Sequence, residues 1–141
     1  MKFTKRILAL TLTMLPMMAF AQLKPDQKII ANVPFQFTVA NKVMPAGVWT
    51  AQRAIMSDRT LLIRNYDAGI ALPSMTLPGE NKTAARTCAL VFNKYGDRYF
   101  LSAIKVEGDR ETYRIPENKV EAELRSENRQ ASQEVIVASL K

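Results

Sequence analysis

Short apolar runs broken by turn-forming residues, at a spacing of about ten positions, fill the chain from residue 28 to residue 106. In the first run, apolar side chains occupy every second position from Ala31 to Val39. This alternation predicts a strand with one face in the core. Pro34 interrupts the run. Because proline has no N–H to donate to a neighbouring strand, we expect a sheet edge or a bulge there. Further strands are expected over residues 48–55, 61–65 and 70–77, with a turn at residues 78–81.

The pair Gly96-Asp97 predicts the turn of a hairpin whose arms are residues 86–95 and 98–106. A glycine in the first position suits the two-residue turns that match the twist of paired strands. Both faces of the second arm are apolar, one with Phe100, Ile104 and Val106 and the other with Tyr99, Leu101 and Ala103. We therefore expect this arm either to be central in a two-layer fold or to be covered on its second face by the helix or a partner.

One short helix is expected at about residues 116–129, followed by a last strand at about residues 134–140. Pro116 suits the first helical position, and Glu121 with Arg125 forms a favourable pair four residues apart. Val120 and Leu124 supply a narrow apolar stripe that predicts packing against the sheet. Together these patterns predict a mostly β fold over residues 28–141: a single small antiparallel β-sandwich or barrel with one short helix near the C-terminus.

Residues 1–21 have the three-part order of a secretory signal peptide. A basic start is followed by a mostly apolar stretch from Ile7 to Phe20, and Ala19 and Ala21 supply the small residues that precede cleavage before Gln22. The apolar stretch is shorter than the roughly 20 residues that span a bilayer. We therefore expect export to the periplasm or the cell exterior. Residues 22–27 are expected to form a flexible leader, and no transmembrane segment is expected in the mature chain.

Removal of this segment lowers the positive charge, because three of the 20 basic residues leave with it and the formal net charge falls from +7 to +4. Cys88 is the single cysteine, so no disulfide can form within one chain. Its neighbours read as a strand interior, and we expect a buried thiol that packs as a small hydrophobe.

No catalytic constellation is recognisable in the sequence. The chain contains no histidine, which removes the commonest general base and zinc ligand. No glycine-rich phosphate loop and no calcium-loop spacing is present. We therefore expect a protein that is not an enzyme and has no catalytic, cofactor-binding or metal-binding residues. The alternative is a polysaccharide hydrolase that uses loop carboxylates, for which the candidates beside predicted turns are Asp58, Asp67, Asp97 and Asp109.

The remaining composition favours a binding or envelope-associated module of unknown ligand. Basic residues exceed acidic ones in the β part, and several could share one exposed sheet face: Arg53, Arg64, Arg86, Lys94 and Arg98. Such a face could bind an anionic glycan or an envelope protein, whereas export argues against nucleic acid. A further alternative is a structural, self-associating protein that pairs through edge strands, with or without a Cys88–Cys88 link.

Two segments resemble parts of an uncharacterised family of short exported bacterial proteins. Val33–Val39 followed by Met44–Gly47 is similar to the opening of that family, and Leu90–Ser102 is similar to its final hairpin. The resemblance implies export and architecture, and it implies no activity. Within the hairpin, aromatic, acidic and basic residues gather at the tip. We therefore predict a contact region there, formed by Tyr95, Asp97, Arg98 and Tyr99.

Overall fold

The computed structural model describes residues 27–127 and 130–141, and the predicted signal segment with Ala19, Ala21 and Gln22 lies outside these ranges. The described residues form strands and one helix in chain order. These are β1 (Lys28–Val33), β2 (Phe37–Val39), β3 (Lys42–Met44), β4 (Gly47–Arg53), β5 (Thr60–Asn65), β6 (Ile70–Met75), β7 (Leu77–Glu80), β8 (Cys88–Tyr95), β9 (Arg98–Lys105), β10 (Glu111–Arg114), α1 (Lys119–Ser126) and β11 (Ser132–Leu140).

The strands form one curled sheet, a half-barrel, in the order β3-β2-β9-β8-β11-β1-β4-β5-β6, with β10 beside β9 and β7 beside β10. Neighbouring strands are antiparallel, apart from one parallel pair that joins Thr38 in β2 to Phe100 in β9. The prediction of a mostly β fold with one short helix near the C-terminus is confirmed.

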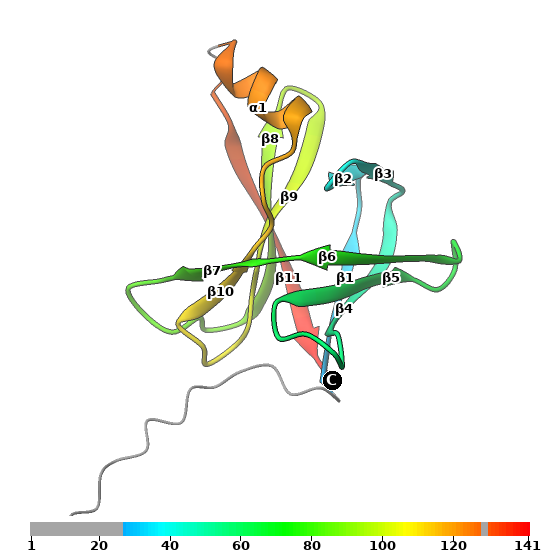
Figure 1. Cartoon of the computed structure of the whole chain (residues 1–141), viewed down its shortest axis with the longest axis vertical. Coiled ribbons are helices and arrows are strands. Elements are labelled where there is room, and N and C mark those ends of the chain that lie inside the picture. Colours follow the sequence, from blue (N-terminus) through cyan, green and yellow to red (C-terminus); the bar gives the residue numbers. More distant parts are fainter. Residues whose placement is uncertain (1–26, 128–129) are drawn as a thin grey trace, which may run out of the picture.

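One extended segment connects two parts of the curled sheet that are far apart in the strand order. β6 pairs with β5, β7 pairs with β10, and only Thr76 separates β6 from β7. Figure 1 shows this β6–β7 segment running across the molecule. Thr76 is buried, and both its backbone N–H and its hydroxyl donate to the carbonyl oxygen of Arg59, at 2.6 and 2.9 Å. The segment is therefore fixed to the β4–β5 loop where it passes between its two strand partners.

The prediction of a turn at residues 78–81 is wrong, because Pro78 and Gly79 lie within β7. They pair with Tyr113 and Thr112 of β10, a strand that the sequence did not reveal. Pro78 is tolerated because β7 is an edge strand, whose outer side needs no N–H donor. Gly79 leaves room for the Arg114 side chain, since a Cβ atom at residue 79 would lie 2.8 Å from the Arg114 Cγ atom and the arginine would have to move.

The strand predicted across Pro34 is two strands with different partners. β1 ends at Val33 and pairs with β4 and β11, whereas β2 begins at Phe37 and pairs with β3 and β9. The expected edge or bulge is therefore a break in the strand. Proline explains the position of the break, since it fixes its own φ and has no N–H for a ladder.

The core lies inside the curl of the sheet and is largely aromatic and branched aliphatic. Phe37 contacts both Trp49 and Phe92, with ring centroids 5.2 Å apart in each pair. Trp49 is buried, and its indole N–H donates to the Pro45 carbonyl oxygen at 3.0 Å. Cys88 is also buried, as predicted. A Cys88–Cys88 link between two chains would thus require this part of the sheet to open.

The hairpin of β8 and β9 has the predicted turn, with Gly96 at φ 61°. A bulge in the pairing sets Val91 opposite Ala103 and Phe92 opposite Leu101, which leaves Ser102 unopposed. The alternation of side chains between the two faces is therefore interrupted at Ser102. Contrary to the prediction, Phe100 and Ile104 lie on different faces of the sheet. Ile104 lies in the main core, whereas Phe100 packs with Tyr95 and Leu124 in a second cluster under α1.

Helix α1 begins at Lys119, three residues later than predicted. Asn118 is its N-cap, with its side-chain oxygen accepting the N–H of Glu121 at 2.7 Å. Pro116 thus precedes the cap and does not occupy the first helical position. This cap satisfies one of the N–H groups that a helix start leaves unpaired.

The buried face of α1 also differs from the predicted stripe. Leu124 is buried, but Val120 is 39% exposed, and Glu121 takes the second buried position. Arg125 pairs with Glu117 at 3.0 Å, and the expected Glu121–Arg125 pair does not form. Glu121 turns instead toward β8, because Asn93 and Tyr95 present hydrogen-bond donors there.

Strand β11 changes its partner along its length. Ser132 to Ala138 pair with β8, whereas β1 meets β11 only at Ser139 and Leu140. From there β1 and β11 diverge, as Figure 1 shows. Within the described residues, the β1-side edge of β11 from Ser132 to Val137 has no strand partner.

Candidate functional site

The predicted contact region at the hairpin tip is divided between two faces of the sheet. Tyr95 is 4% exposed and packs edge-on against Phe100, with ring centroids 5.8 Å apart. Its hydroxyl donates to a carboxylate oxygen of Glu121 at 3.4 Å. Tyr95 therefore contributes to the contact between α1 and the hairpin, and it is not part of the accessible surface.

Tyr99 points to the opposite face, where its ring stacks on Phe35 at a centroid distance of 3.8 Å. The Lys94 ammonium lies 5.2 Å from the same ring, and its hydrogen bond with Tyr99 raises the pKa of Lys94. Asp97 and Arg98 are exposed at the turn, with the Arg98 guanidinium 5.5 Å from the Phe100 ring. The four residues thus do not form one surface cluster, and contact by Asp97, Arg98 and Tyr99 stays a prediction.

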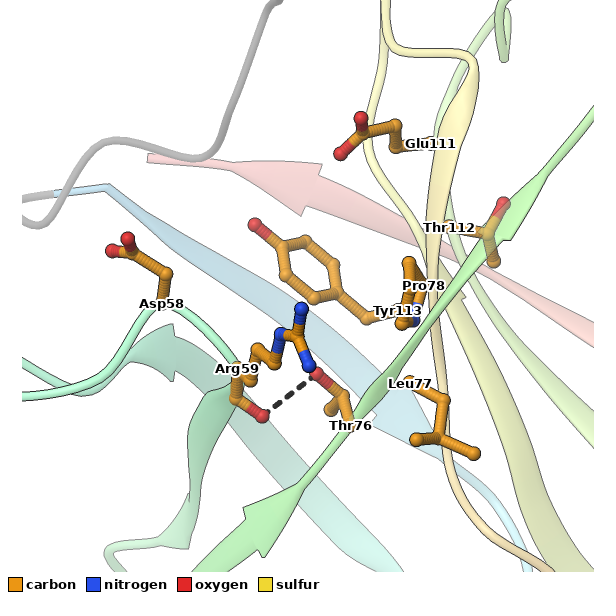
Figure 2. Close-up of a pocket in the computed structure, with 8 residues that line it drawn as sticks. All are labelled: Asp58, Arg59, Thr76, Leu77, Pro78, Glu111, Thr112 and Tyr113. Carbon is orange, nitrogen blue, oxygen red and sulfur yellow. Dashed lines mark hydrogen bonds between the residues drawn. The ribbon is translucent and has the colours of Figure 1, made fainter.

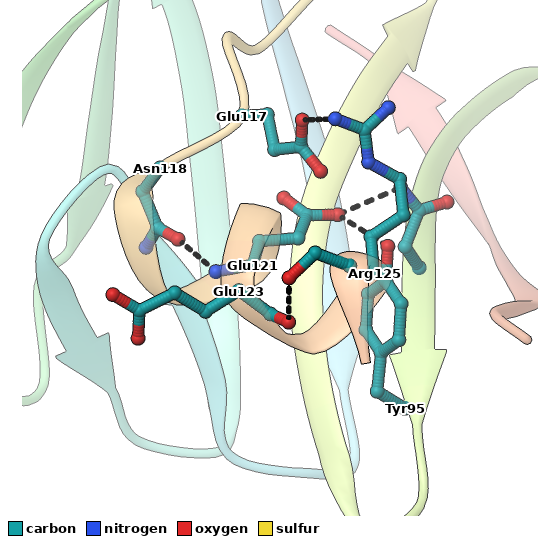
Figure 3. A network of polar contacts seen from close by, with 8 residues as sticks. Tyr95, Glu117, Asn118, Glu121, Glu123 and Arg125 are labelled. Carbon is teal, nitrogen blue, oxygen red and sulfur yellow. Dashed lines mark hydrogen bonds and ion pairs between the residues drawn. The ribbon is translucent and has the colours of Figure 1, made fainter. Parts of the chain in front are cut away.

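Beneath α1, Glu121 is the centre of a buried polar network (Figure 3). Its carboxylate accepts from the Asn93 amide at 2.9 Å as well as from Tyr95. Burial raises the pKa of Glu121, and its two hydrogen bonds only partly oppose this effect. The group attaches the helix to the hairpin and is closed to ligands.

A pocket of about 260 Å³, which we call the Tyr113 pocket, lies between the β4–β5 loop, the β6–β7 junction and β10 (Figure 2). Figure 2 shows the Tyr113 hydroxyl directed toward the loop that carries Asp58 and Arg59. The lining combines an aromatic ring, charged groups, hydroxyls and apolar carbons: Asp58, Arg59, Thr76, Leu77, Pro78, Glu111, Thr112 and Tyr113.

The backbone on both sides of this pocket is held by hydrogen bonds. On the loop side, the Ser57 hydroxyl accepts the N–H of Arg59 at 3.3 Å, and the Arg59 carbonyl oxygen accepts from Thr76. On the β10 side, the Asp109 carboxylate accepts the N–H of Glu111 at 2.8 Å. The side chains of Arg59 and Glu111 therefore project from fixed backbone, which favours a preformed site.

Charges around the pocket nearly cancel. Asp58 lies 3.4 Å from the Arg53 guanidinium, in an ion pair at the pocket rim. Arg59 and Glu111 bring one further charge of each sign. A polyanion would therefore meet no net positive field here, whereas a neutral molecule rich in hydroxyl groups could accept from Arg59 and donate to the carboxylates.

A second cavity, a groove of about 360 Å³, lies beside β6 on the way to α1. Pro73 and Met75 form one wall, and Ile115 and Pro116 form part of the other. Its lining is more apolar than that of the Tyr113 pocket, and fewer donors and acceptors converge in it. The Tyr113 pocket is therefore the better candidate for recognition of a polar ligand.

The four aspartates predicted as hydrolase candidates lie in different places. Asp67 and Asp97 are exposed in turns, and Asp109 is buried with its carboxylate holding the β10 backbone. Asp58 alone among them lines the Tyr113 pocket, where the second carboxylate is Glu111. In the described part of the chain, no three His, Cys, Asp or Glu side chains are placed to hold a metal ion.

The sequence suggested that several of five basic residues could share one sheet face, but two of them, Arg53 and Arg64, do not. Arg64 pairs across the sheet with Thr50 and Ala71, whereas Arg53 pairs with Leu61, whose side chain points into the core. Adjacent positions of a strand point to opposite faces, so Arg53 and Arg64 lie on opposite sides of the sheet.

No helix among the described residues is long and apolar enough to cross a membrane.

The sequence did not indicate Arg59, Thr76 or Glu111 as site residues. They come together because β7 pairs with β10, which joins residues more than thirty positions apart. Only Tyr113 carried a usable signal, as an aromatic residue with a stacking face.

Comparison with protein-family models, with curated proteins and with solved structures found no match to this chain.

Proposed function

We propose that this protein is an exported, non-enzymatic binding module that recognises a neutral, hydroxyl-rich ligand such as a sugar unit in the Tyr113 pocket. The observation that carries the proposal is the convergence of Arg59, Glu111 and the Tyr113 ring on one pocket of about 260 Å³. Ligand sites combine apolar and aromatic walls with a few placed polar groups, and the pockets that bind drug-sized ligands have volumes of roughly 300–1,000 Å³. A single ring-sized unit suits this smaller volume.

The direct test is a thermal-shift screen with neutral glycans, anionic polymers, lipid headgroup analogues and divalent metals. A ligand present at about 100 times its dissociation constant stabilises the folded state by about 2.7 kcal/mol, which raises the melting midpoint visibly. We expect a shift with a neutral glycan that persists in high salt. If a cooperatively melting protein shows no shift with any neutral glycan, the proposed ligand class is wrong.

Two arginine variants locate the site. Arg59→Ala removes the guanidinium but keeps the carbonyl group that holds Thr76, so it should abolish the glycan shift and leave the unliganded melting midpoint close to that of the wild type. Arg98→Ala is the matched control, since Arg98 is exposed at the remote hairpin tip. Loss of the shift in Arg98→Ala with retention in Arg59→Ala would move the site to the tip.

Polysaccharide hydrolysis is the second candidate, because two carboxylates, Asp58 and Glu111, line the same pocket. Glycoside hydrolysis commonly needs two such groups on either side of the scissile bond. Release of reducing sugar that is lost in both Asp58→Asn and Glu111→Gln would favour this function. Binding that survives both substitutions, with no sugar released by the wild type, would favour the binding module.

Export is the remaining element of the proposal, and it rests on the sequence of residues 1–21. We expect the full chain, expressed in a bacterial host, to be recovered outside the cytoplasm with Gln22 as its first residue. Intact-mass measurement of the recovered protein checks both points. A cytoplasmic protein that retains Met1–Ala21 would contradict them.

A further inference from the structure

The edges of the curled sheet differ in how they are protected against pairing with another chain. β6 has Pro73 in its interior, and β7 contains Pro78 and ends with Glu80. β3 has only three residues and begins with an exposed lysine, Lys42. Proline, charge and shortness are the common means by which proteins prevent an edge from acting as a template.

The β1-side edge of β11 has none of these protections in its centre. Val135, Ile136 and Val137 follow one another there, with Val135 52% and Val137 67% exposed. Within the described residues no strand pairs with this edge before Ser139. A run of β-branched residues with unpaired backbone groups is the kind of edge to which a further strand adds.

Val135 and Val137 continue an apolar row on the outer face of the sheet. Val135 lies opposite Val91, which lies opposite Ala103, and Val137 lies opposite Ala89. Val91, Ala89 and Ala103 are all buried, so the row becomes exposed only where it reaches the β11 edge. The exposed end of this apolar row and the backbone groups that have no strand partner among the described residues therefore lie at the same edge of β11.

We propose that this edge binds the same edge of a second copy of this chain, in an antiparallel pair centred on Ile136. In this register each Val135 lies opposite the partner's Val137 and the two Ile136 residues face each other. The apolar rows of the two sheets then join without interruption. Cross-strand pairs of β-branched residues are favourable neighbours in antiparallel sheets.

The charges are compatible with this symmetric pairing. In the proposed register each Glu134 lies opposite the partner's Ala138, so no like charges meet. Within its own chain, Glu134 lies near Lys94, whose pKa it helps to raise. A two-fold pair of identical strands is an isologous contact, which closes on itself and does not propagate into a fibre. The proposal is independent of the Tyr113 pocket and of its ligand.

A contact of about five residues in each strand buries less area than a stable dimer usually needs, so we expect reversible association. Light scattering after size exclusion should give a dimer mass at high protein concentration and a monomer mass on dilution. Val137→Lys should weaken the dimer more than about tenfold, because it brings a charge next to the partner's Val135. Val43→Lys is the matched control, since Val43 is an exposed valine on the protected edge of β3.

A cross-linking experiment tests the register itself. An equal mixture of Val135→Cys and Val137→Cys should give a disulfide-linked dimer on mild oxidation, whereas each variant alone should give little. The native thiol should not interfere, because Cys88 is buried. Melting curves establish that each variant is folded. A wild-type protein that stays monomeric at every concentration, a dimer that survives Val137→Lys, or equal cross-linking of Val135→Cys alone would each overturn the proposal.

Discussion

The β6–β7 segment joins strands that are far apart in the sheet, whereas α1 packs on the adjacent strands β8 and β9, and the two are attached by different chemistry. At the β6–β7 segment the groups that bond are neutral, since the N–H and hydroxyl of Thr76 donate to the Arg59 carbonyl oxygen. At α1 the central group is the buried carboxylate of Glu121. The attachment of α1 should therefore depend on pH, whereas that of the β6–β7 segment should not.

Apolar packing should still outweigh the polar contacts at α1. Leu124→Ala is expected to lower the free energy of unfolding by about 2–3 kcal/mol, because it leaves a cavity between α1 and Phe100. Urea denaturation followed by circular dichroism measures this change. Val120→Ala is the control on the same helix and should cost less than about 0.5 kcal/mol, since Val120 is partly exposed. Equal costs for the two variants would mean that α1 does not pack through Leu124.

At the β6–β7 segment, Thr76→Val should cost about 1–2 kcal/mol of unfolding free energy. The substitution removes the side-chain hydrogen bond to Arg59 and keeps both the shape and the backbone hydrogen bond. The loss should be the same at pH 5 and pH 8, within about 0.3 kcal/mol, because no group involved titrates there. Thr83→Val, at an exposed loop position, is the control. A loss that varies strongly with pH would erase the contrast with α1.

Gly79→Ala should cost about 1 kcal/mol, because the new methyl group meets the Arg114 side chain across the β7–β10 pair. Arg114 is exposed and can be shortened. The double variant Gly79→Ala with Arg114→Ala should therefore recover most of the loss, and a double-mutant cycle measures the coupling. Additive losses would show that Arg114 is not the obstacle.

The smallest change in the free energy of unfolding at neutral pH is expected for Glu121→Gln. This variant tests most directly whether the attachment of α1 depends on pH and that of the β6–β7 segment does not. Burial raises the pKa of Glu121 above its ordinary value of 4.5, so the folded protein binds this proton more tightly than the unfolded chain does. Stability from this group is therefore greatest below pH 4.5 and falls as pH rises through the raised pKa.

Glu121→Gln removes the charge while its amide oxygen can still accept from Asn93 and Tyr95. The variant should be as stable as the wild type or more stable at pH 7, and its stability should change less between pH 4.5 and pH 7. Glu123→Gln is the control, because Glu123 is an exposed carboxylate on the same helix. An unchanged pH profile in Glu121→Gln would assign the pH dependence to another group.

Where apolar runs lie between clear turn signals, the sequence was sufficient to predict the strands. The runs that became β4 and β5 are bounded by turn residues, and the β8–β9 hairpin follows from its glycine turn, so these signals depend on neighbouring residues alone. β3 and β10 were missed because they have three and four residues. Strands this short form because neighbouring strands pair with them, and their own residues are too few to carry a periodic signal.

Local rules failed where a distant partner decided the outcome. Pro78-Gly79 reads as a turn until β10 pairs with it, and Glu121 reads as a solvent-exposed partner of Arg125 until Asn93 and Tyr95 lie beside it. The Tyr113 pocket depends on the same β7–β10 pair. Its residues could not be chosen before that pairing was known.

The burial of Cys88 also has a consequence for measurement. Its Sγ atom accepts the N–H of Glu107 at 3.3 Å, and the residue lies opposite Ala138 near the point where β11 joins β1. A thiol reagent can reach it only when this part of the sheet opens. Since a reagent attacks only the exposed thiolate, the rate at which the single cysteine is modified reports the free energy of opening at the junction of β8, β11 and β1.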